Sequence, residues 1–248
     1  MLNVDLNCDV GEGCGHDAEL LSLVSSANIA CGYHAGDEVT MRKTVDLAVE
    51  NGIAIGAHPG YPDRENFGRV AMDLTDAEIA RIVTDQINAL AKIAKTAGGK
   101  VTHVKPHGAL YNQSARDSEL ASVIAMAVAD LDDDLVLFGL SGSHSSSEAE
   151  KIGLRTASEV FADRTYQSDG SLTPRTDPNA LIQDPESAST QVLDMIKYGR
   201  VRSVDAIMIS IVAQTVCIHG DGENAVKFAR VINRGLVQNG IEIKAIDA

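Results

Sequence analysis

The sequence contains no tryptophan, few aromatic residues and no long run of apolar or basic side chains. Its 248 residues carry 35 acidic side chains against 21 basic ones, for a formal net charge of -14. Such an excess of negative charge argues against partners that are nucleic acids or anionic membranes. No apolar run approaches the roughly 20 residues that a membrane-spanning helix needs. The first residues enter a strand-like segment without a basic leader, so we expect a cytoplasmic protein.

Cysteine is also scarce, and its four positions form no Cys-x-x-Cys pair. A disulfide framework is not expected in a cytoplasmic chain of this length. Three of the four cysteines lie in or beside strand-like segments, as small buried side chains do. Cys31 and His34 have a spacing that two zinc ligands can have, but no second pair follows. The sequence therefore favours buried, unreacted cysteines.

Short apolar runs that end near a histidine recur along the chain. Each run has the length of a buried strand, and glycine follows it in a turn. The runs at 28–31, 53–57, 101–104 and 215–218 are followed by His34, His58, His107 and His219. Because parallel strands deliver their C-terminal ends to one side of a sheet, we expect the four histidines to converge on one site.

Seven or eight strand-like segments alternate with helix-like segments, which indicates a parallel sheet with right-handed crossovers. The chain has no internal repeat and no linker, so we predict a single domain over residues 1–248. Polar groups at many strand ends favour a closed α/β barrel, in which every strand ends at one mouth. The clearest helix runs from Asp76 to about Ala97, with Thr75 as its N-cap and Glu78 completing a capping box.

Three further stretches carry expectations of their own. The serine-rich stretch 141–147 is predicted to be a loop, in which His144 is solvated. The stretch 164–185 holds three prolines and has no clear period, and we predict a lid or a partner-docking flap there. An apolar run also spans 206–212.

Polar residues alternate along the first strand-like segment. Asp5, Asn7 and Asp9 are spaced by two, so in a strand they point to one face, toward the interior of a barrel. Buried polar side chains need partners, and this alternation therefore favours a functional role.

Long polar motifs make the chain resemble the LamB/YcsF family over nearly its whole length. The motifs are DLNCDVGEG at 5–13, SANIACGYHAGDEVTM at 26–41, IGAHPGYPD at 55–63, FGR at 67–69, HVKPHGALYN at 103–112, EVFADRTY at 159–166 and CIHGD at 217–221. The resemblance implies a seven-stranded variant of the β/α barrel, similar to glycoside hydrolase and deacetylase barrels. It also implies one subunit of the bacterial ATP-dependent 5-oxoprolinase, which works with two further subunits. That enzyme converts 5-oxo-L-proline, ATP and water to L-glutamate, ADP and phosphate.

The residue types suit this reaction. Resonance makes a five-membered lactam a poor electrophile, and phosphorylation of its oxygen by ATP, with Mg as counter-ion, creates a leaving group. The site then needs cations for phosphate and carboxylate, and a base for water. We expect catalytic roles for Asp9, His34, His58, Lys105, His107 and His219. We expect substrate-binding roles for Asn7, Glu12, Asp63, Arg69, Tyr111, Asn112, Glu159, Arg164 and Asp221.

Two other functions fit the same residues. A divalent ion with an open position for water, as in a metal-dependent amide or carbohydrate hydrolase, is one of them. Its ligands would be Asp9, His34, His58 and His219. The other is a non-catalytic subunit that holds substrate or nucleotide for its partners. Metal content of the purified protein tests the first, and ligand binding by the isolated chain tests the second.

Lys105 and His107 flank a proline that stiffens the turn between them, which holds both side chains at the mouth. Replacing either is expected to lower turnover by at least about 100-fold. From the sequence alone, Lys105→Met and His107→Ala are expected to leave folding near that of the wild type.

Overall fold

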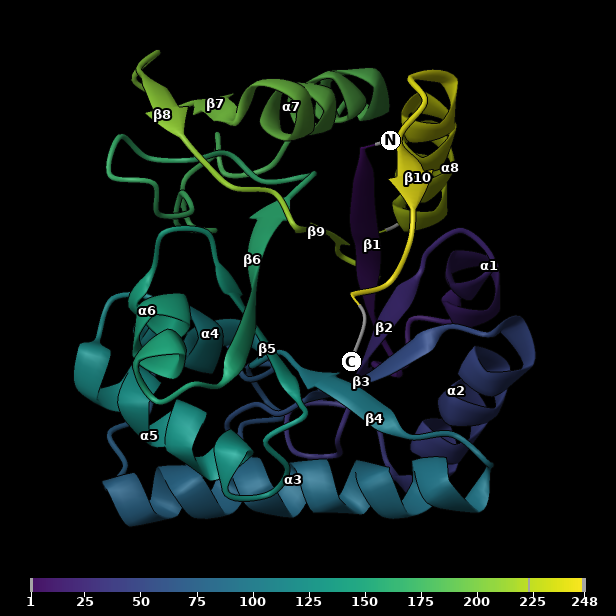
Figure 1. Cartoon of the computed structure of the whole chain (residues 1–248), viewed down its shortest axis with the longest axis vertical. Coiled ribbons are helices and arrows are strands. Elements are labelled where there is room, and N and C mark those ends of the chain that lie inside the picture. The colour runs from purple at the N-terminus through teal and green to yellow at the C-terminus, as the bar shows by residue number, and fades with distance from the viewer. Residues whose placement is uncertain (1, 223, 247–248) are drawn as a thin grey trace.

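The computed structural model describes residues 2–222 and 224–246 and contains a closed parallel β barrel surrounded by helices (Figure 1). Seven strands form the barrel in the order β1–β2–β3–β4–β5–β6–β9, and β9 pairs with β1 to close it. They are β1 (Asn3–Val10), β2 (Ser26–Ala30), β3 (Ala54–His58), β4 (Val101–Val104), β5 (Val136–Leu140), β6 (Arg155–Phe161) and β9 (Thr215–Ile218). The predicted seven-stranded barrel is confirmed.

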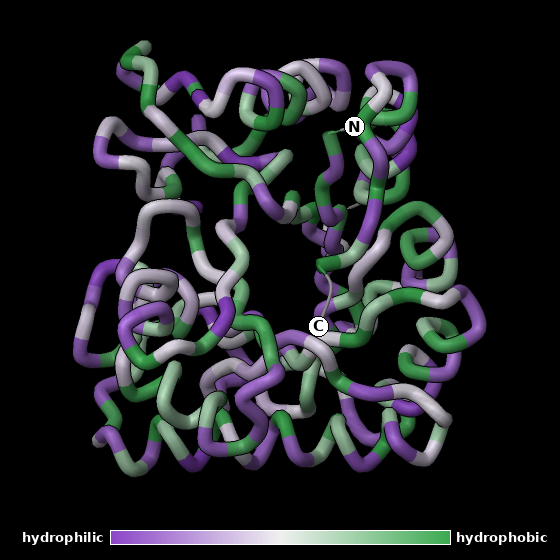
Figure 2. The backbone as a smooth tube through the Cα atoms, in the orientation of Figure 1, coloured by the Kyte–Doolittle hydropathy of each residue, from purple (hydrophilic) through white to green (hydrophobic). Residues whose placement is uncertain are grey.

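Helices connect the strands and form the outer layer. They are α1 (Asp17–Leu21), α2 (Glu38–Asn51), α3 (Asp76–Thr96), α4 (Gly108–Ser114), α5 (Ser118–Ala129), α6 (His144–Lys151), α7 (Pro185–Tyr198) and α8 (Ala225–Gln238). Hydrophilic and hydrophobic residues alternate along the turns of helices such as α3, the long helix at the lower edge of the view (Figure 2). The apolar face packs on the barrel, as an amphipathic period dictates. None of the described helices is long and apolar enough to cross a membrane.

The N-terminus of α3 forms as the sequence predicts. The Thr75 hydroxyl accepts a hydrogen bond from the backbone N–H of Glu78, and the Glu78 carboxylate accepts one from the backbone N–H of Thr75. These two bonds satisfy backbone donors that the first helical turn leaves free. The buried positions of α3 recur every three or four residues from Ile79 to Ile93.

The serine-rich stretch was wrongly predicted to be a loop, because α6 begins at His144. His144 itself is exposed, as expected. Ser145 and Ser146 are buried against β5, where a Cβ at Gly139 would lie 2.9 Å from the Ser145 Cβ. Small side chains on both elements therefore let the helix approach the strand closely.

The apolar run at 206–212 lies outside the barrel. It contains β8 (Met208–Ser210), which pairs antiparallel with β7 (Arg200–Arg202) in a separate two-stranded sheet. Of its apolar side chains, Ile207, Met208 and Val212 are exposed. A short strand, β10 (Glu242–Ile243), pairs with the start of β1 and extends the sheet there.

The barrel interior below the mouth contains a column of hydrogen-bonded polar side chains. The Asp5 carboxylate accepts from Ser26 and Thr215, at 2.6 and 2.5 Å. The amide of Asn7 donates to Glu159 at 3.0 Å, and also to Thr215 at 2.6 Å. Asn28 donates to Asn7 at 2.7 Å. The alternating polar residues of β1 therefore point into the barrel, as predicted, and each has the partner that a buried polar group requires.

His103 on β4 completes this column and gives it a dependence on pH. Its Nε2 donates to Asn28 at 3.0 Å, and its Nδ1 faces the Thr102 hydroxyl at 3.2 Å. Burial, followed by the charges of Lys105 and His58, lowers the pKa of His103 to about 3. The native ring is therefore neutral at pH values where the unfolded chain takes up a proton.

We expect His103→Gln to make the protein less sensitive to acid. Because the native pKa lies below the unfolded value of about 6.5, the contribution of His103 to stability is present above that pH and is lost as the pH falls below it. Acidification from about pH 7.5 to about pH 5.5 should cost the wild type about 1.4 kcal/mol more than the variant. Urea unfolding of both proteins at the two pH values measures this difference, and equal losses would contradict the assignment.

Candidate functional site

Lys105 follows β4 at the C-terminal mouth of the barrel, and its ammonium group is enclosed by three acceptors. Its Nζ lies 2.9 Å from Asp9 Oδ1, 2.9 Å from the Cys217 sulfur and 3.0 Å from Glu159 Oε1. The side chain is only 2% exposed. Strands β1, β4, β6 and β9 thus each contribute one group to this cage.

The cage determines the charge of its members. Burial alone would lower the pKa of Lys105, but Asp9, Cys217 and Glu159 raise it well above its usual range. Burial likewise opposes the charge of Asp9, and the charges of Lys105 and His58 nonetheless hold its pKa well below the usual range. Lys105 is therefore an ammonium ion throughout the neutral range and acts as a fixed cation, not as a base.

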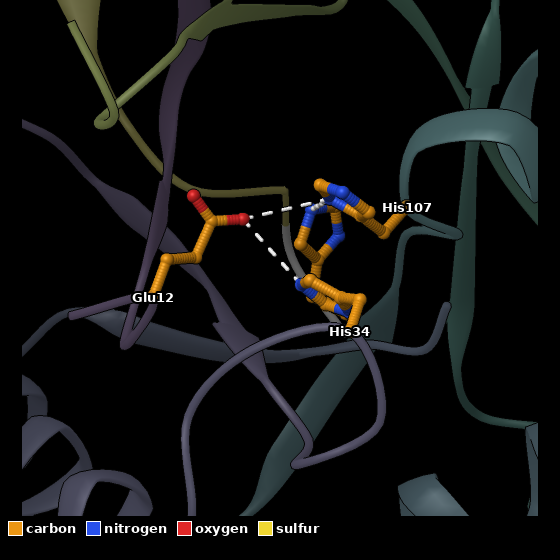
Figure 3. A group of neighbouring side chains, drawn as sticks. Glu12, His34 and His107 are labelled. Carbon is orange, nitrogen blue, oxygen red and sulfur yellow. Dashed lines mark hydrogen bonds and ion pairs between the residues drawn. The ribbon is translucent and has the colours of Figure 1, made fainter. Parts of the chain in front are cut away.

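Beside the lysine, Glu12 approaches a group of three histidines (Figure 3). Its Oε1 lies 3.5 Å from His34 Nε2 and 3.5 Å from His107 Nδ1. The rings of His34 and His107 are stacked, with centroids 3.8 Å apart. His58 lies edge-on to both rings, and its Nε2 is 2.9 Å from His107 Nδ1.

Backbone carbonyls orient two of these histidines. His58 Nδ1 lies 2.7 Å from the carbonyl oxygen of Lys105, and His107 Nε2 lies 2.9 Å from that of Phe67. Phe67 has a φ of 56°, a left-handed conformation that bulky residues rarely adopt. Strain of this kind persists where the surroundings impose it, and here it aims a carbonyl group at the site.

The loop after β3 packs onto the histidines through two glycines. A Cβ at Gly60 would lie 2.7 Å from His34 Nδ1, and a Cβ at Gly68 would lie 2.8 Å from the Cβ of His34. Only glycine fits at these positions without displacing the rings. The motifs at 55–63 and 67–69 therefore position the cluster through their backbone.

His219 lies on the other side of the mouth, with its own acidic partner. Its Nδ1 donates to both carboxylate oxygens of Asp163, each at 2.9 Å. Burial opposes the charge of Asp163, but the neighbouring His219 outweighs it and lowers the pKa of this carboxyl. Arg69 forms a partly exposed ion pair with Asp221 nearby. The histidine–carboxylate pair leaves His219 Nε2 available toward the cavity.

A cavity of about 600 Å³ opens at this mouth. Its wall includes many of the predicted residues, namely Asp9, Glu12, His58, Arg69, Lys105, His107, Tyr111, Asn112, Arg164, His219 and Asp221. Residues 172–176 of the stretch predicted to be a lid also line it. Arg164 holds this stretch in place by donating to the carbonyls of Thr173 and Ala180, at 2.6 and 3.3 Å.

Four of the predicted site residues lie away from the cavity wall. Asn7 and Glu159 are fully buried in the barrel, where they support Thr215 and Lys105. Asp63 caps the turn before Asn66, and His34 lies behind the other histidines. Alternation along a strand predicts which face a side chain takes, but not its depth in the barrel.

Three residues of the mouth were not predicted to act there. Asp163 orients His219, and Arg116 and Arg175 contribute cations to the cavity wall. Asp163 lies in the EVFADRTY motif at a strand end, which is the signal that could have identified it. The two arginines lie in connecting segments with no such pattern.

Together, the fold and the mouth define a β/α-barrel protein with a lysine-centred, polar ligand site at the C-terminal ends of its strands. The chain belongs to the LamB/YcsF family, whose sequence model matches residues 4–248. A relative from Geobacillus kaustophilus (strain HTA426), whose name makes it one of the subunits of a 5-oxoprolinase, is 56% identical over 249 residues, covering 99% of this chain and 97% of the relative.

Solved structures show the same architecture. A lactam utilization protein from Thermus thermophilus is 43% identical and superposes with a TM-score of 0.93, over 99% of this chain and 100% of that one. The polysaccharide deacetylase Bc1974 from Bacillus cereus is 11% identical, with a TM-score of 0.54 over 100% of this chain and 93% of that one. The second likeness concerns the fold alone, and it agrees with the predicted resemblance to deacetylase barrels.

Proposed function

We propose that this chain is the lactam-binding subunit of an ATP-dependent 5-oxoprolinase. It would act with two further subunits to convert 5-oxo-L-proline to L-glutamate, with ATP, as its Mg complex, hydrolysed to ADP and phosphate. The observation that carries this proposal is the permanently charged Lys105 at the floor of a cavity whose wall also holds Arg69, Arg116 and Arg175. Lactam opening through a phosphorylated intermediate develops negative charge, and fixed cations stabilise such charge. The relatives named for 5-oxoprolinase and for lactam utilization support the same reaction class.

His219 is the base that the geometry favours. Because its Nδ1 donates to Asp163, the neutral ring keeps an acceptor at Nε2. Such an orientation suits a group that takes a proton from attacking water. Lys105 would hold the lactam oxygen or the phosphoryl group that it receives, and the arginines of the wall would bind the substrate carboxylate.

The first experiment separates this function from its rivals. The isolated chain is expected to bind 5-oxo-L-proline, measured by calorimetry, and to release little glutamate with ATP. Adding the two companion subunits should produce ATP-dependent glutamate release. Full turnover by the isolated chain, or ring opening without ATP, would contradict the proposal and favour a metal-dependent hydrolase. Ligand binding by a chain that never supports turnover would favour a purely binding role.

His219→Ala should lower glutamate formation by the assembled complex by at least about 100-fold, because general acid–base groups contribute about 100- to 10,000-fold in rate. His144→Ala removes an exposed histidine of α6 and is the matched control, with turnover near that of the wild type. Both variants should assemble normally in size-exclusion chromatography. Equal turnover in the two folded variants would remove His219 from the mechanism.

A further inference from the structure

We propose that Glu12, His34, His58 and His107 form a binding site for one divalent transition-metal ion. The inference concerns these four side chains alone and does not depend on the substrate of the protein. One ligand atom from each residue lies within 4.8 Å of all the others.

The hydrogen bonds of His58 and His107 leave two lone pairs facing each other. Each ring has one nitrogen against a backbone carbonyl, which only accepts, so that nitrogen carries the hydrogen. The opposite nitrogens, His58 Nε2 and His107 Nδ1, are then both acceptors in the neutral rings, yet they lie 2.9 Å apart. Two lone pairs at this distance repel unless a cation, either a proton or a metal ion, lies against both. Carbonyls that bind the far nitrogen are also the usual outer partners of metal-bound histidines.

The other two members of the cluster are buried without hydrogen-bond partners. His34 makes no hydrogen bond through either ring nitrogen, and Glu12 Oε1 makes none either. The His34 side chain is fully buried and that of Glu12 is 4% exposed. Buried polar atoms without partners are costly, and a bound ion would satisfy them. Because His34 is stacked on His107, we expect the His34 ring to tilt when both coordinate one ion.

The charges of the mouth leave room for a cation. Among the described residues, Asp9, Glu12 and Glu159 are buried carboxyl groups beside one buried ammonium, that of Lys105. A proton would have to be held on rings that burial keeps neutral, since burial lowers the pKa of His34 to about 2 and that of His107 well below its usual range. Imidazole nitrogens with a carboxylate oxygen instead suit Zn²⁺ and its first-row neighbours.

A second group of potential ligands, Asp9, Cys217 and His219, is a weaker candidate. The Lys105 ammonium already lies 2.9 Å from both Asp9 and Cys217, so a cation occupies the centre of that group. His219 is turned to Asp163. The four ligands expected from the sequence, Asp9, His34, His58 and His219, are therefore brought together only in part, and Glu12 and His107 complete the set.

Cobalt titration of the full chain, after removal of metal with a chelator, tests the site without any assay of activity. The wild type is expected to bind one Co²⁺ per chain, with the visible ligand-field absorption of a nitrogen- and oxygen-ligated ion, and to gain thermal stability in its presence. Zn²⁺ should displace it. His107→Ala should weaken binding at least about 100-fold, since even outer partners of metal ligands contribute about 10- to 100-fold.

Glu12→Gln is the second test variant, because it keeps the size of the side chain and removes a charged ligand. We expect it to fold and to bind Co²⁺ at least about tenfold more weakly. His144→Ala and His219→Ala are the controls, and both should bind as the wild type does. The proposal is overturned if the folded wild type takes up no stoichiometric Co²⁺ or Zn²⁺, if Glu12→Gln binds unchanged, or if binding is lost in either control.

Discussion

Lys105→Met is expected to lower the free energy of unfolding by about 3–5 kcal/mol, and turnover of the assembled complex by at least about 100-fold. The ammonium group is the buried partner of both Asp9 and Glu159. Its removal leaves two carboxylates in the barrel without their cation, and an unpaired buried charge is strongly destabilising. The structure therefore revises the expectation from the sequence that this substitution leaves folding near that of the wild type.

A double variant separates the two losses. Lys105→Met with Glu159→Gln removes one of the abandoned charges and should recover part of the stability without recovering turnover. Lys151→Met is the control, because Lys151 is exposed on α6 and pairs only with Glu148, so it should change stability by no more than about 0.5 kcal/mol. Urea unfolding and glutamate release would be measured on the same preparations. A fully stable Lys105→Met protein would contradict the caged arrangement.

Gly220→Ala is expected to lower the free energy of unfolding by at least about 2 kcal/mol, since overpacking typically costs about 1–3 kcal/mol and here the obstacle is backbone. A Cβ at Gly220 would lie 2.2 Å from the carbonyl oxygen of Asp9. The turn after β9 and the end of β1 must then move apart. This displaces Asp9 from Lys105, so turnover should fall as well.

Gly222→Ala is the matched control, two residues further on. A Cβ there meets no atom within 4 Å, and Gly222 has no positive φ. Its stability should stay within about 0.5 kcal/mol of that of the wild type. Thermal unfolding of the pair tests the close approach of the two strand ends, and equal melting temperatures would show that the turn is free to relax.

Much of the fold could be predicted because its signals are local. The period of apolar residues and the capping box at Thr75 define α3, and short apolar runs define the barrel strands. The prediction failed at α6, where serines that read as a loop pack on β5. It was also incomplete at β8, since an apolar run does not reveal whether it will be buried.

The position of polar residues at strand ends was predictable for the same reason. His34, His58 and His107 converge as expected, since parallel strands of a barrel end at one mouth. His219 shares that mouth but pairs with Asp163 in place of the other three histidines. The catalytic and binding roles of these residues stay predictions.

The sequence by itself determined which segments become strands and helices, and which polar side chains stand at the barrel mouth, because periodicity and turn chemistry act over a few residues. Only the tertiary structure decided that Lys105 meets Asp9, 96 positions away, and Cys217, 112 positions away. The charges of the site were decided there too. A pKa depends on burial and on neighbours within a few ångströms, and the chain acquires both only when the barrel closes.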